Sequence, residues 1–257
     1  MLPISDDNPT ASTPWMTYAI IAATLATWFV VQGAGGDPAL VKSVCTAGLV
    51  PAELTHLRPL GYSIQMSRDW SCVVDDSPIN WFTPLTSVFL HGGWGHLLGN
   101  MWFFWVFGNN IEDSMGPRRF LAFYLVCGVL AAVAHIISAP SSAIPTVGAS
   151  GAISGIMGAY FALFPTARVN LLFFFVVFFK IIPVPAWVAL LWWFGWQVVA
   201  GVPALQGGAG ALGGVAVWAH IGGFVAGLLL IRKFVDPAKL ELRRRLYAEQ
   251  YPDLTRS

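Results

Sequence analysis

Long apolar runs dominate this chain and restrict its fold more than any other feature of the sequence. Six of them are separated by polar or glycine-rich stretches, at residues 15–31, 93–111, 120–137, 150–163, 186–199 and 215–231. Charged residues make up only 11% of the 257 residues, against about 25% in soluble domains. Runs of this kind are typical of helices that cross a bilayer. The sequence therefore predicts an all-α membrane protein with six transmembrane helices.

The basic residues indicate how these helices are oriented. Eleven of the fourteen lysines and arginines follow the second, fourth and sixth runs, and the other three lie in the long first loop. Because basic residues accumulate on the cytoplasmic side, we expect both termini in the cytoplasm of a cell (inner) membrane and the first loop outside. The expected parts are a cytoplasmic N-terminus (residues 1–13), a six-helix membrane domain (14–231, including the loop 34–92) and a cytoplasmic tail (232–257).

Two stretches between the runs have their own expectations. The first loop is too long for a simple connector and holds Cys45 and Cys72. These cysteines pair if the loop faces an oxidising compartment, and the sequence leaves both outcomes open. Residues 168–183 are apolar but interrupted by Lys180 and Pro183, and we expect them to form an interfacial lead-in to the fifth helix.

A cluster of small residues, Gly148-Ala149-Ser150-Gly151, opens the fourth run. A helix over residues 150–163 is about 21 Å long, shorter than the ~30 Å hydrocarbon core. It must therefore begin below one membrane face, with its first turn buried in protein. A serine at such a helix N-terminus lies beside unpaired N–H groups that can stabilise an oxyanion. Small residues in membrane helices also serve packing alone, so a nucleophile here requires a base nearby.

Polar residues on the second and sixth predicted helices lie at a matching depth. They are His91, His96 and Asn100 on the second and His220 on the sixth. Such residues inside membrane spans are expensive and are functional candidates by default. No aspartate or glutamate lies at this depth, so the arrangement predicts a Ser–His dyad with His96 and Asn100 as oxyanion donors.

Stripes of small residues allow the base to reach the serine. Ser150, Ser154 and Gly158 recur every four residues on the fourth predicted helix, and His220, Gly223 and Gly227 share one face of the sixth. Such stripes let two helix backbones approach closely in lipid. We therefore expect the His220 imidazole within hydrogen-bond range of the Ser150 hydroxyl.

Over residues 81–230 the chain resembles the rhomboid intramembrane serine proteases of the compact six-helix bacterial type. The resemblance rests on His91-x4-His96-x3-Asn100, on Gly148-Ala149-Ser150-Gly151 and on Ala219-His220-x2-Gly223-x3-Gly227. It implies a six-helix rhomboid-like bundle in which Ser150 is the nucleophile and His220 the general base and acid. The implied oxyanion donors are His96, Asn100 and the Ser150 amide. Structural support is implied for His91, Glu112, Gly148, Gly151, Gly223 and Gly227, with Glu112 anchoring the cytoplasmic end of the second helix.

The implied function is cleavage of transmembrane segments of single-pass or polytopic membrane proteins, without a cofactor or metal, in an active site that opens to the extracytoplasmic side.

Two positions depart from the pattern of some members: Ser154 replaces a tyrosine that stacks on the catalytic histidine, and Phe82 replaces an arginine after Trp81. The near-neutral charge and the absence of basic–aromatic clusters give no sign of a nucleic-acid partner.

Several alternatives remain open from the sequence. Ser154 also precedes a glycine and is a second candidate nucleophile, one turn deeper. His135 joins the other histidines in a possible metal cluster, which lacks the cysteines or carboxylates of a usual site. A catalytically silent rhomboid-like protein that binds membrane helices is the alternative function, and a small transporter is disfavoured because no internal repeat is visible. The oligomeric state is not predicted.

Overall fold

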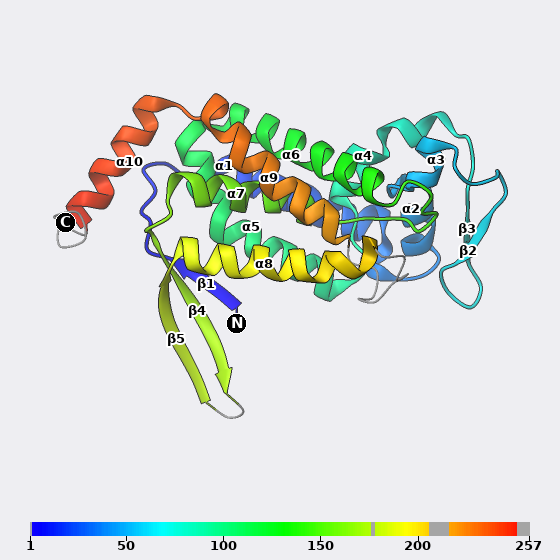
Figure 1. Ribbon diagram of the computed structural model, residues 1–257, viewed down its shortest axis with the longest axis horizontal. Helices are drawn as coiled ribbons and strands as arrows, with labels where there is room; N and C mark the ends of the chain where they lie inside the picture. The colour runs from blue at the N-terminus through cyan, green and yellow to red at the C-terminus, as the bar shows by residue number, and fades with distance from the viewer. Residues whose placement is uncertain (1, 176–177, 206–215, 251–257) are drawn as a thin grey trace.

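A bundle of helices forms the body of the computed structural model, which describes residues 2–175, 178–205 and 216–250 (Figure 1). Six of the described helices pack together in it: α1 (Trp15–Ala26, extended by η1, Thr27–Val31), α5 (Trp94–Met115), α6 (Pro117–Ser138), α7 (Ser150–Leu163), α8 (Ala186–Leu205) and α9 (Val217–Phe234). Each helix begins within three residues of the start of one of the six apolar runs. The chain is thus mostly helical, as its apolar runs predict.

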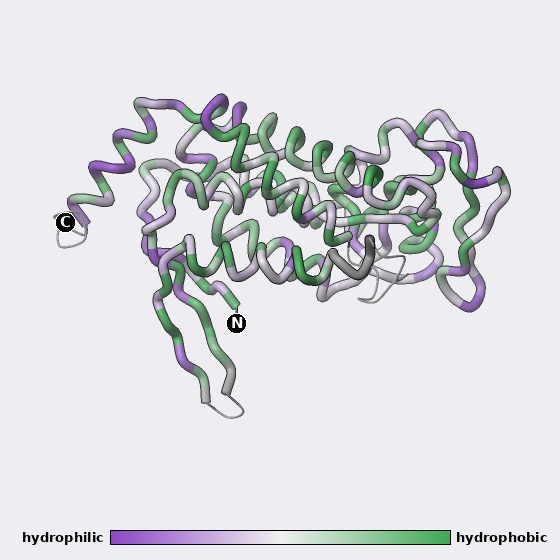
Figure 2. The backbone as a smooth tube through the Cα atoms, in the orientation of Figure 1, coloured by the Kyte–Doolittle hydropathy of each residue, from purple (hydrophilic) through white to green (hydrophobic). Residues whose placement is uncertain are grey.

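Apolar residues make up much of the bundle's helices (Figure 2). Among the described residues, α6 and α9 are long and apolar enough to cross a membrane, and residues 15–31, 150–163 and 186–201 form shorter apolar helices. The α7 helix has the bounds that the sequence predicts, 150–163. The glycine-rich stretch between the fifth and sixth apolar runs lies partly in α8, which continues to Leu205, and otherwise outside the described residues.

The two ends of the bundle differ, and we call them the loop end and the tail end. The loop end carries the first loop, with η2 (Gly33–Gly35), α2 (Ala39–Ala47), α3 (Pro51–Thr55), β2 (Ser63–Gln65), β3 (Ser71–Val73), η3 (Pro78–Phe82), α4 (Thr83–Thr86) and η4 (Ser87–Phe89). A disulfide joins Cys45 of α2 to Cys72 of β3, which settles the pairing that the sequence left open. The tail end carries α10 (Pro237–Gln250).

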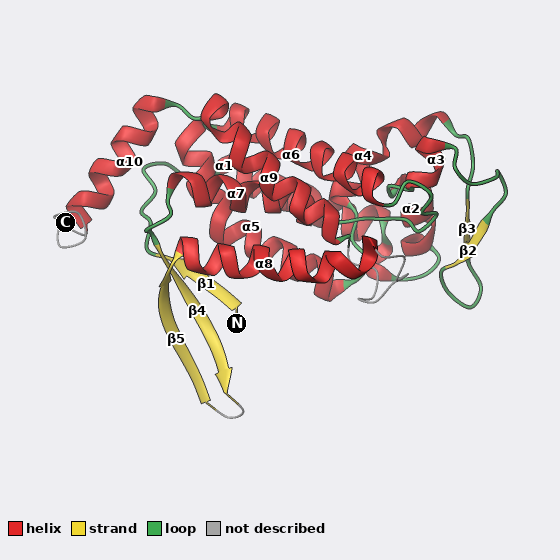
Figure 3. Cartoon of the chain, viewed as in Figure 1, coloured by secondary structure: helices red, strands yellow, loops and turns green. Residues whose placement is uncertain are grey.

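The expectation of an all-α fold is wrong, because a small β-sheet lies at each end of the helical bundle. At the tail end, β1 (Leu2–Asp6), β4 (Arg168–Phe175) and β5 (Phe178–Pro185) form an antiparallel sheet in the order β1-β4-β5, and the β4–β5 hairpin projects from the bundle (Figure 3). At the loop end, β2 pairs with β3. Valine, isoleucine and phenylalanine favour extended backbone, and Pro183 and Pro185 oppose a helix. The expected lead-in at 168–183 is therefore a hairpin.

Backbone contact between α7 and α9 fixes the relation of the two helices that carry the dyad candidates. A Cβ atom at Gly223 would collide with the carbonyl oxygen of Gly151, and one at Gly227 would collide with that of Gly155. Only glycine permits this approach. The contact uses Gly223 and Gly227 of the stripe predicted on α9, but on α7 it is made at Gly151 and Gly155, beside the predicted positions Ser150 and Ser154. The contact begins at the first turn of each helix, so it brings the N-terminal ends of α7 and α9 together.

A set of buried polar side chains lies at the tail end, and we call it the tail-end cluster. Its members are Asp6, Asn8, Asn110, Asp113, Tyr160 and Arg243. Arg243 of α10 forms an ion pair with Asp113 of α5 at 2.9 Å and donates to Asn8 and Asn110. A run of three arginines such as Arg243–Arg245 usually faces solvent or anionic lipid, but Arg243 is buried, with 1% of it exposed.

Candidate active site

The turn before α7 presents Ser150 as the first residue of the helix. Gly148 has a φ of +128°, and a Cβ atom there would lie 2.7 Å from the His96 ring. Glycine is therefore required both by the backbone conformation and by the neighbouring ring. The Gly148 N–H donates to the carbonyl of Ser87, and Thr146 pairs with Leu49 in a short bridge. The first loop thus holds the segment that leads into the serine.

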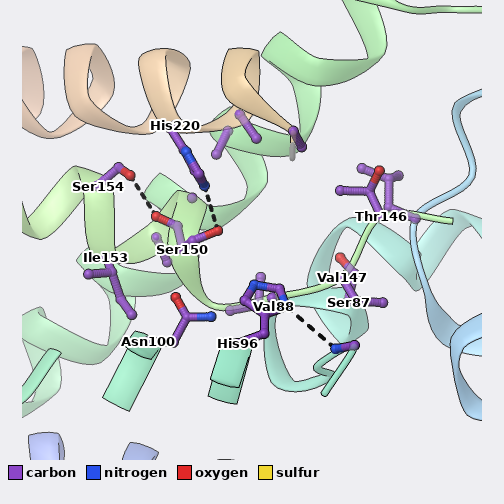
Figure 4. A pocket seen from close by; sticks show the side chains of 18 of the residues that line it. Ser87, Val88, His96, Asn100, Thr146, Val147, Ser150, Ile153, Ser154 and His220 are labelled. Atoms are coloured by element: carbon purple, nitrogen blue, oxygen red, sulfur yellow. Dashed lines mark hydrogen bonds between the residues drawn. The ribbon is translucent and has the colours of Figure 1, made fainter. Parts of the chain in front are cut away.

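The expected contact between the two dyad candidates is present. His220 Nε2 lies 2.8 Å from Ser150 Oγ, and the two side chains point toward one another (Figure 4). Ser154, the second candidate nucleophile, instead donates from its Oγ to the Ser150 carbonyl oxygen at 2.6 Å. The His220 imidazole therefore contacts Ser150. Ser154 lies one turn deeper, and its hydroxyl is bonded to a backbone carbonyl instead.

A glutamine that the sequence analysis missed contacts the other side of the imidazole. Gln197 Oε1 of α8 lies 2.9 Å from His220 Nδ1. The Trp193 ring, one turn earlier on α8, lies 5.9 Å from the His220 ring between centroids. The signal that would have found Gln197 is a polar side chain inside an apolar run. Its partner comes from a different helix, so the sequence did not indicate the contact.

The expected oxyanion donors line one cavity with the dyad candidates. This cavity has a volume of about 810 Å³, and His96, Asn100, Gly148, Ser150, Gly151 and His220 are in its wall. The Asn100 Nδ2 is buried and has no hydrogen-bond partner within the described part of the chain. The Gly92 N–H donates to His96 Nδ1 at 3.4 Å, which leaves the proton on Nε2. Both groups are therefore donors available to a ligand.

His91, which the resemblance implies as a structural residue, is held in place through its backbone. The Gln32 side chain accepts from the His91 N–H at 2.9 Å and donates to the His91 carbonyl at 2.8 Å. Burial lowers the pKa of His91 to about 3, with His96 adding to the effect, so the ring is neutral. Its edge packs on the His96 ring at 5.2 Å. His91 thus supports His96 by packing, through a loop that Gln32 holds.

Glu112 caps the start of α1 from the far end of α5. Its carboxylate accepts from the Met16 N–H at 2.8 Å and from the Thr17 N–H and Thr17 Oγ1 at 2.7 Å each. A carboxylate is favourable at a helix N-terminus, where N–H groups lack helical partners. The contact joins α5 to α1 at the tail end.

A scan against protein families matches the chain to the Rhomboid domain over residues 78–236, well over half of its length. The chain belongs to the rhomboid family. This membrane-protein family is the one that the motifs on α5, α7 and α9 resemble, and the matched residues include all of them.

Curated rhomboid relatives are similar at moderate identity. Rhomboid protease GluP of Bacillus subtilis is 39% identical over 79 residues, 31% of this chain and 15% of that protein. Rhomboid protein 1, mitochondrial, of Saccharomyces cerevisiae is 32% identical over 168 residues, 63% of this chain and 44% of that protein. The putative rhomboid protease YdcA of Bacillus subtilis is 35% identical over 80 residues, 31% of this chain and 40% of that protein. The chain thus spans less than half the length of each.

His135, the remaining histidine within the matched residues, lies beside the site and contacts the segment that leads into Ser150. His135 Nε2 of α6 lies 3.0 Å from Thr146 Oγ1, in the segment before Ser150. Within residues 2–175, 178–205 and 216–250, no three histidine, cysteine or acidic side chains are grouped to hold a metal ion.

Proposed function

We propose that this rhomboid-family protein is an intramembrane serine endopeptidase in which Ser150 is the nucleophile and His220 the general base and acid. The observation that carries the proposal is the 2.8 Å contact of Ser150 Oγ with His220 Nε2 at the wall of an 810 Å³ cavity. A serine hydroxyl is a weak nucleophile until a base accepts its proton, and this contact provides one.

The proposed reaction proceeds through an acyl-enzyme. The Ser150 hydroxyl gives its proton to His220 Nε2 and attacks the scissile carbonyl, whose oxygen becomes an oxyanion. His96 Nε2, Asn100 Nδ2 and the Ser150 backbone N–H donate to that oxygen. His220 then protonates the leaving amine. A water molecule, deprotonated by His220, hydrolyses the ester and releases Ser150.

The proposed topology has six membrane spans, with both termini in the cytoplasm and the site open to the extracytoplasmic side. Two observations support it. Eleven basic residues follow the second, fourth and sixth apolar runs, as expected for the cytoplasmic side in this arrangement. The Cys45–Cys72 disulfide lies at the loop end, and disulfides persist in oxidising compartments. The proposed parts are residues 1–13, 14–231 and 232–257, in a cell membrane.

The proposed substrates are membrane proteins whose transmembrane segments enter between α5 and α8. A cavity of about 410 Å³ lies in this position, with Phe103 and Phe107 of α5 and Leu190 of α8 in its wall. It shares Phe103, Met157 and Trp193 with the larger cavity. Its apolar wall suits a segment that arrives from lipid, and the shared residues connect it to Ser150.

The test is cleavage of a single-pass reporter by the full chain in lipid vesicles. We expect cleavage by the unaltered protein, none above background for Ser150→Ala or His220→Ala, and activity within about threefold for the matched control Ser154→Ala, because that hydroxyl does not touch the imidazole. Cleavage that survives Ser150→Ala contradicts the proposal. A folded unaltered protein that retains the reporter without cutting any such segment supports the catalytically silent alternative.

A further inference from the structure

We propose that Gln197 is a positioning residue of this site, which fixes the tautomer and the orientation of the His220 imidazole. The contact between Gln197 and His220 is an observation of the structure, and its effect on catalysis rests on the proposed function. Gln197 lies on α8, between the exposed Trp196 and Val198, yet its side-chain oxygen reaches His220 Nδ1 of α9 at 2.9 Å. A polar side chain in an apolar helix is favourable only with a partner, and here the partner is the imidazole.

The identity of the atoms determines the direction of the hydrogen bond. An amide oxygen only accepts, so His220 Nδ1 must carry a proton to form this contact. In the neutral imidazole Nε2 is then without a proton and accepts from the Ser150 hydroxyl, 2.8 Å away. The opposite tautomer would point an N–H at Ser150 and a lone pair at Gln197 Oε1. In the orientation that the structure shows, with Oε1 toward Nδ1, the Gln197 amide therefore favours the tautomer that a general base requires.

The same contact stabilises the charged form that arises during the reaction. When Nε2 takes the serine proton, Nδ1–H remains directed at Gln197 Oε1, and a hydrogen bond to a charged donor is stronger than one to a neutral donor. Gln197 is thus the hydrogen-bond partner of Nδ1 both before and after the proton transfer.

Trp193 holds the ring by packing but cannot replace this function. Its ring is tilted by 39° from the His220 ring at 5.9 Å, so it restricts where the imidazole lies. Packing on a ring face does not distinguish the two nitrogens. Trp193 and Gln197, one helical turn apart, thus supply position and tautomer separately, at a place where Ser154 offers no aromatic ring.

The test compares Gln197→Met with Gln197→Glu in the full chain. The two side chains are similar in length, but only glutamate keeps an oxygen acceptor. The readout is the rate at which a fluorophosphonate labels Ser150, which needs no substrate to enter the site. We expect about a 10- to 100-fold slower rate for Gln197→Met, since a hydrogen bond to a charged group is lost, and a rate within about fivefold for Gln197→Glu. Val199→Ala, at an exposed position on α8, is the control without effect.

Two further readouts separate positioning from a general structural defect. In Gln197→Met we expect the midpoint of the acidic limb of the labelling rate to move about one unit to lower pH, because the imidazolium has lost its acceptor. The ¹⁵N spectrum of histidine-labelled protein should show a protonated Nδ1 at His220 in the unaltered protein and mixed tautomers in Gln197→Met. Equal rates, equal acidic limbs and equal ¹⁵N spectra for the Met and Glu variants overturn the inference.

The failure of the inference is distinguishable from the failure of the proposed function. If the unaltered protein neither cuts nor is labelled, the function is wrong, and the ¹⁵N spectrum still tests the contact. If the unaltered protein is active and Gln197→Met matches it in all three readouts, the function stands and the role of Gln197 is wrong.

Discussion

The protein has two sets of buried polar side chains, at opposite ends of the bundle, and they differ in how their hydrogen bonds are met. In the tail-end cluster, Arg243 contacts Asp113, Asn110 and Asn8, and Tyr160 donates to Asp6 at 2.6 Å. Of the buried side-chain nitrogen and oxygen atoms in the tail-end cluster, Arg243 Nε has no hydrogen-bond partner within the described residues. Neither the 810 Å³ nor the 410 Å³ cavity has any of these side chains in its wall.

At the loop end the polar side chains line a cavity, and their hydrogen bonds to one another are incomplete. His96, Asn100, Ser150 and His220 line the larger cavity, and the Asn100 amide lacks a partner within the described chain. A buried polar group without a partner is unfavourable for folding, and Asn100, unlike Arg243, lines a cavity that a ligand can enter. The comparison teaches that a buried polar group inside an apolar bundle indicates a site when it lacks a partner and also lines a cavity. The tail-end cluster should therefore control stability, and the loop-end residues activity.

The largest expected effect is on stability, from Arg243→Met. Removing the guanidinium leaves the buried Asp113 carboxylate without its ion-pair partner, and breaking a buried pair in this way costs about 3–5 kcal/mol. Thermal unfolding in detergent should show a large fall in Tm, with residual activity per folded molecule unchanged. Arg244→Met, at the exposed neighbouring position, is the matched control. An Arg243→Met protein that melts like the control would remove the structural half of the comparison.

The next effect is on activity, from Asn100→Ala. Loss of one oxyanion donor reduces kcat by about 10²–10³-fold, while removal of an amide that lacks a partner should leave Tm unchanged or slightly raised. Kinetics on the reporter and thermal unfolding measure the two quantities in one preparation. A variant that loses stability and keeps its kcat would reverse the comparison.

A smaller effect is expected from Glu112→Gln, which tests a polar contact outside both sets. The glutamine amide would direct an NH2 group at donors from Met16 and Thr17. We expect a loss of about 1–3 kcal/mol in the free energy of unfolding, since a buried hydrogen-bond partner is removed. Unfolding by a chemical denaturant in mixed micelles would measure this free energy. Unfolding free energies equal within error would show that the cap of α1 does not depend on the charge.

The smallest effect is a pH dependence of stability that originates at Asp6. Burial raises the pKa of Asp6 from 3.8 to about 7, although Tyr160 and Arg243 act to lower it. The folded protein therefore binds more protons than the unfolded chain between these values, so the contribution is fully present below pH 4 and is lost as pH rises through 7. We expect Tm to fall by a few degrees between pH 5 and pH 8.

Asp6→Asn should show a smaller fall in Tm over the same interval. Burial also raises the pKa of Glu53 to about 7, but this group contributes equally to both proteins and cancels in their difference. An identical pH dependence of Tm in the two proteins would contradict the assignment to Asp6.

Residues whose roles depend on local pattern could be predicted from the sequence. Spacing along single helices predicts the start of α7 at Ser150, the stripe of Gly223 and Gly227 on α9 and the motif on α5. Residues whose partners lie on other elements could not. Gln197 acquires a role only because α8 packs beside α9, and Arg243 is buried only because α10 returns to the end of α5.

The strands escaped prediction for a different reason. Residues 168–185 are apolar enough to suit a membrane-associated helix, and the period of a strand is hidden where every residue of a run is apolar. The pairing of β4 with both β5 and β1 decides the conformation. The partner β1 comes from residues 2–6, whose short polar surroundings gave no sign of a strand.

The most direct test of the central claim, that the His220 imidazole activates the Ser150 hydroxyl in the loop-end cavity, is to map fluorophosphonate labelling by mass spectrometry. The account predicts one adduct on Ser150 in the unaltered protein, and none in a folded His220→Ala variant. An adduct on Ser154, or labelling of Ser150 that is undiminished in His220→Ala, would contradict it.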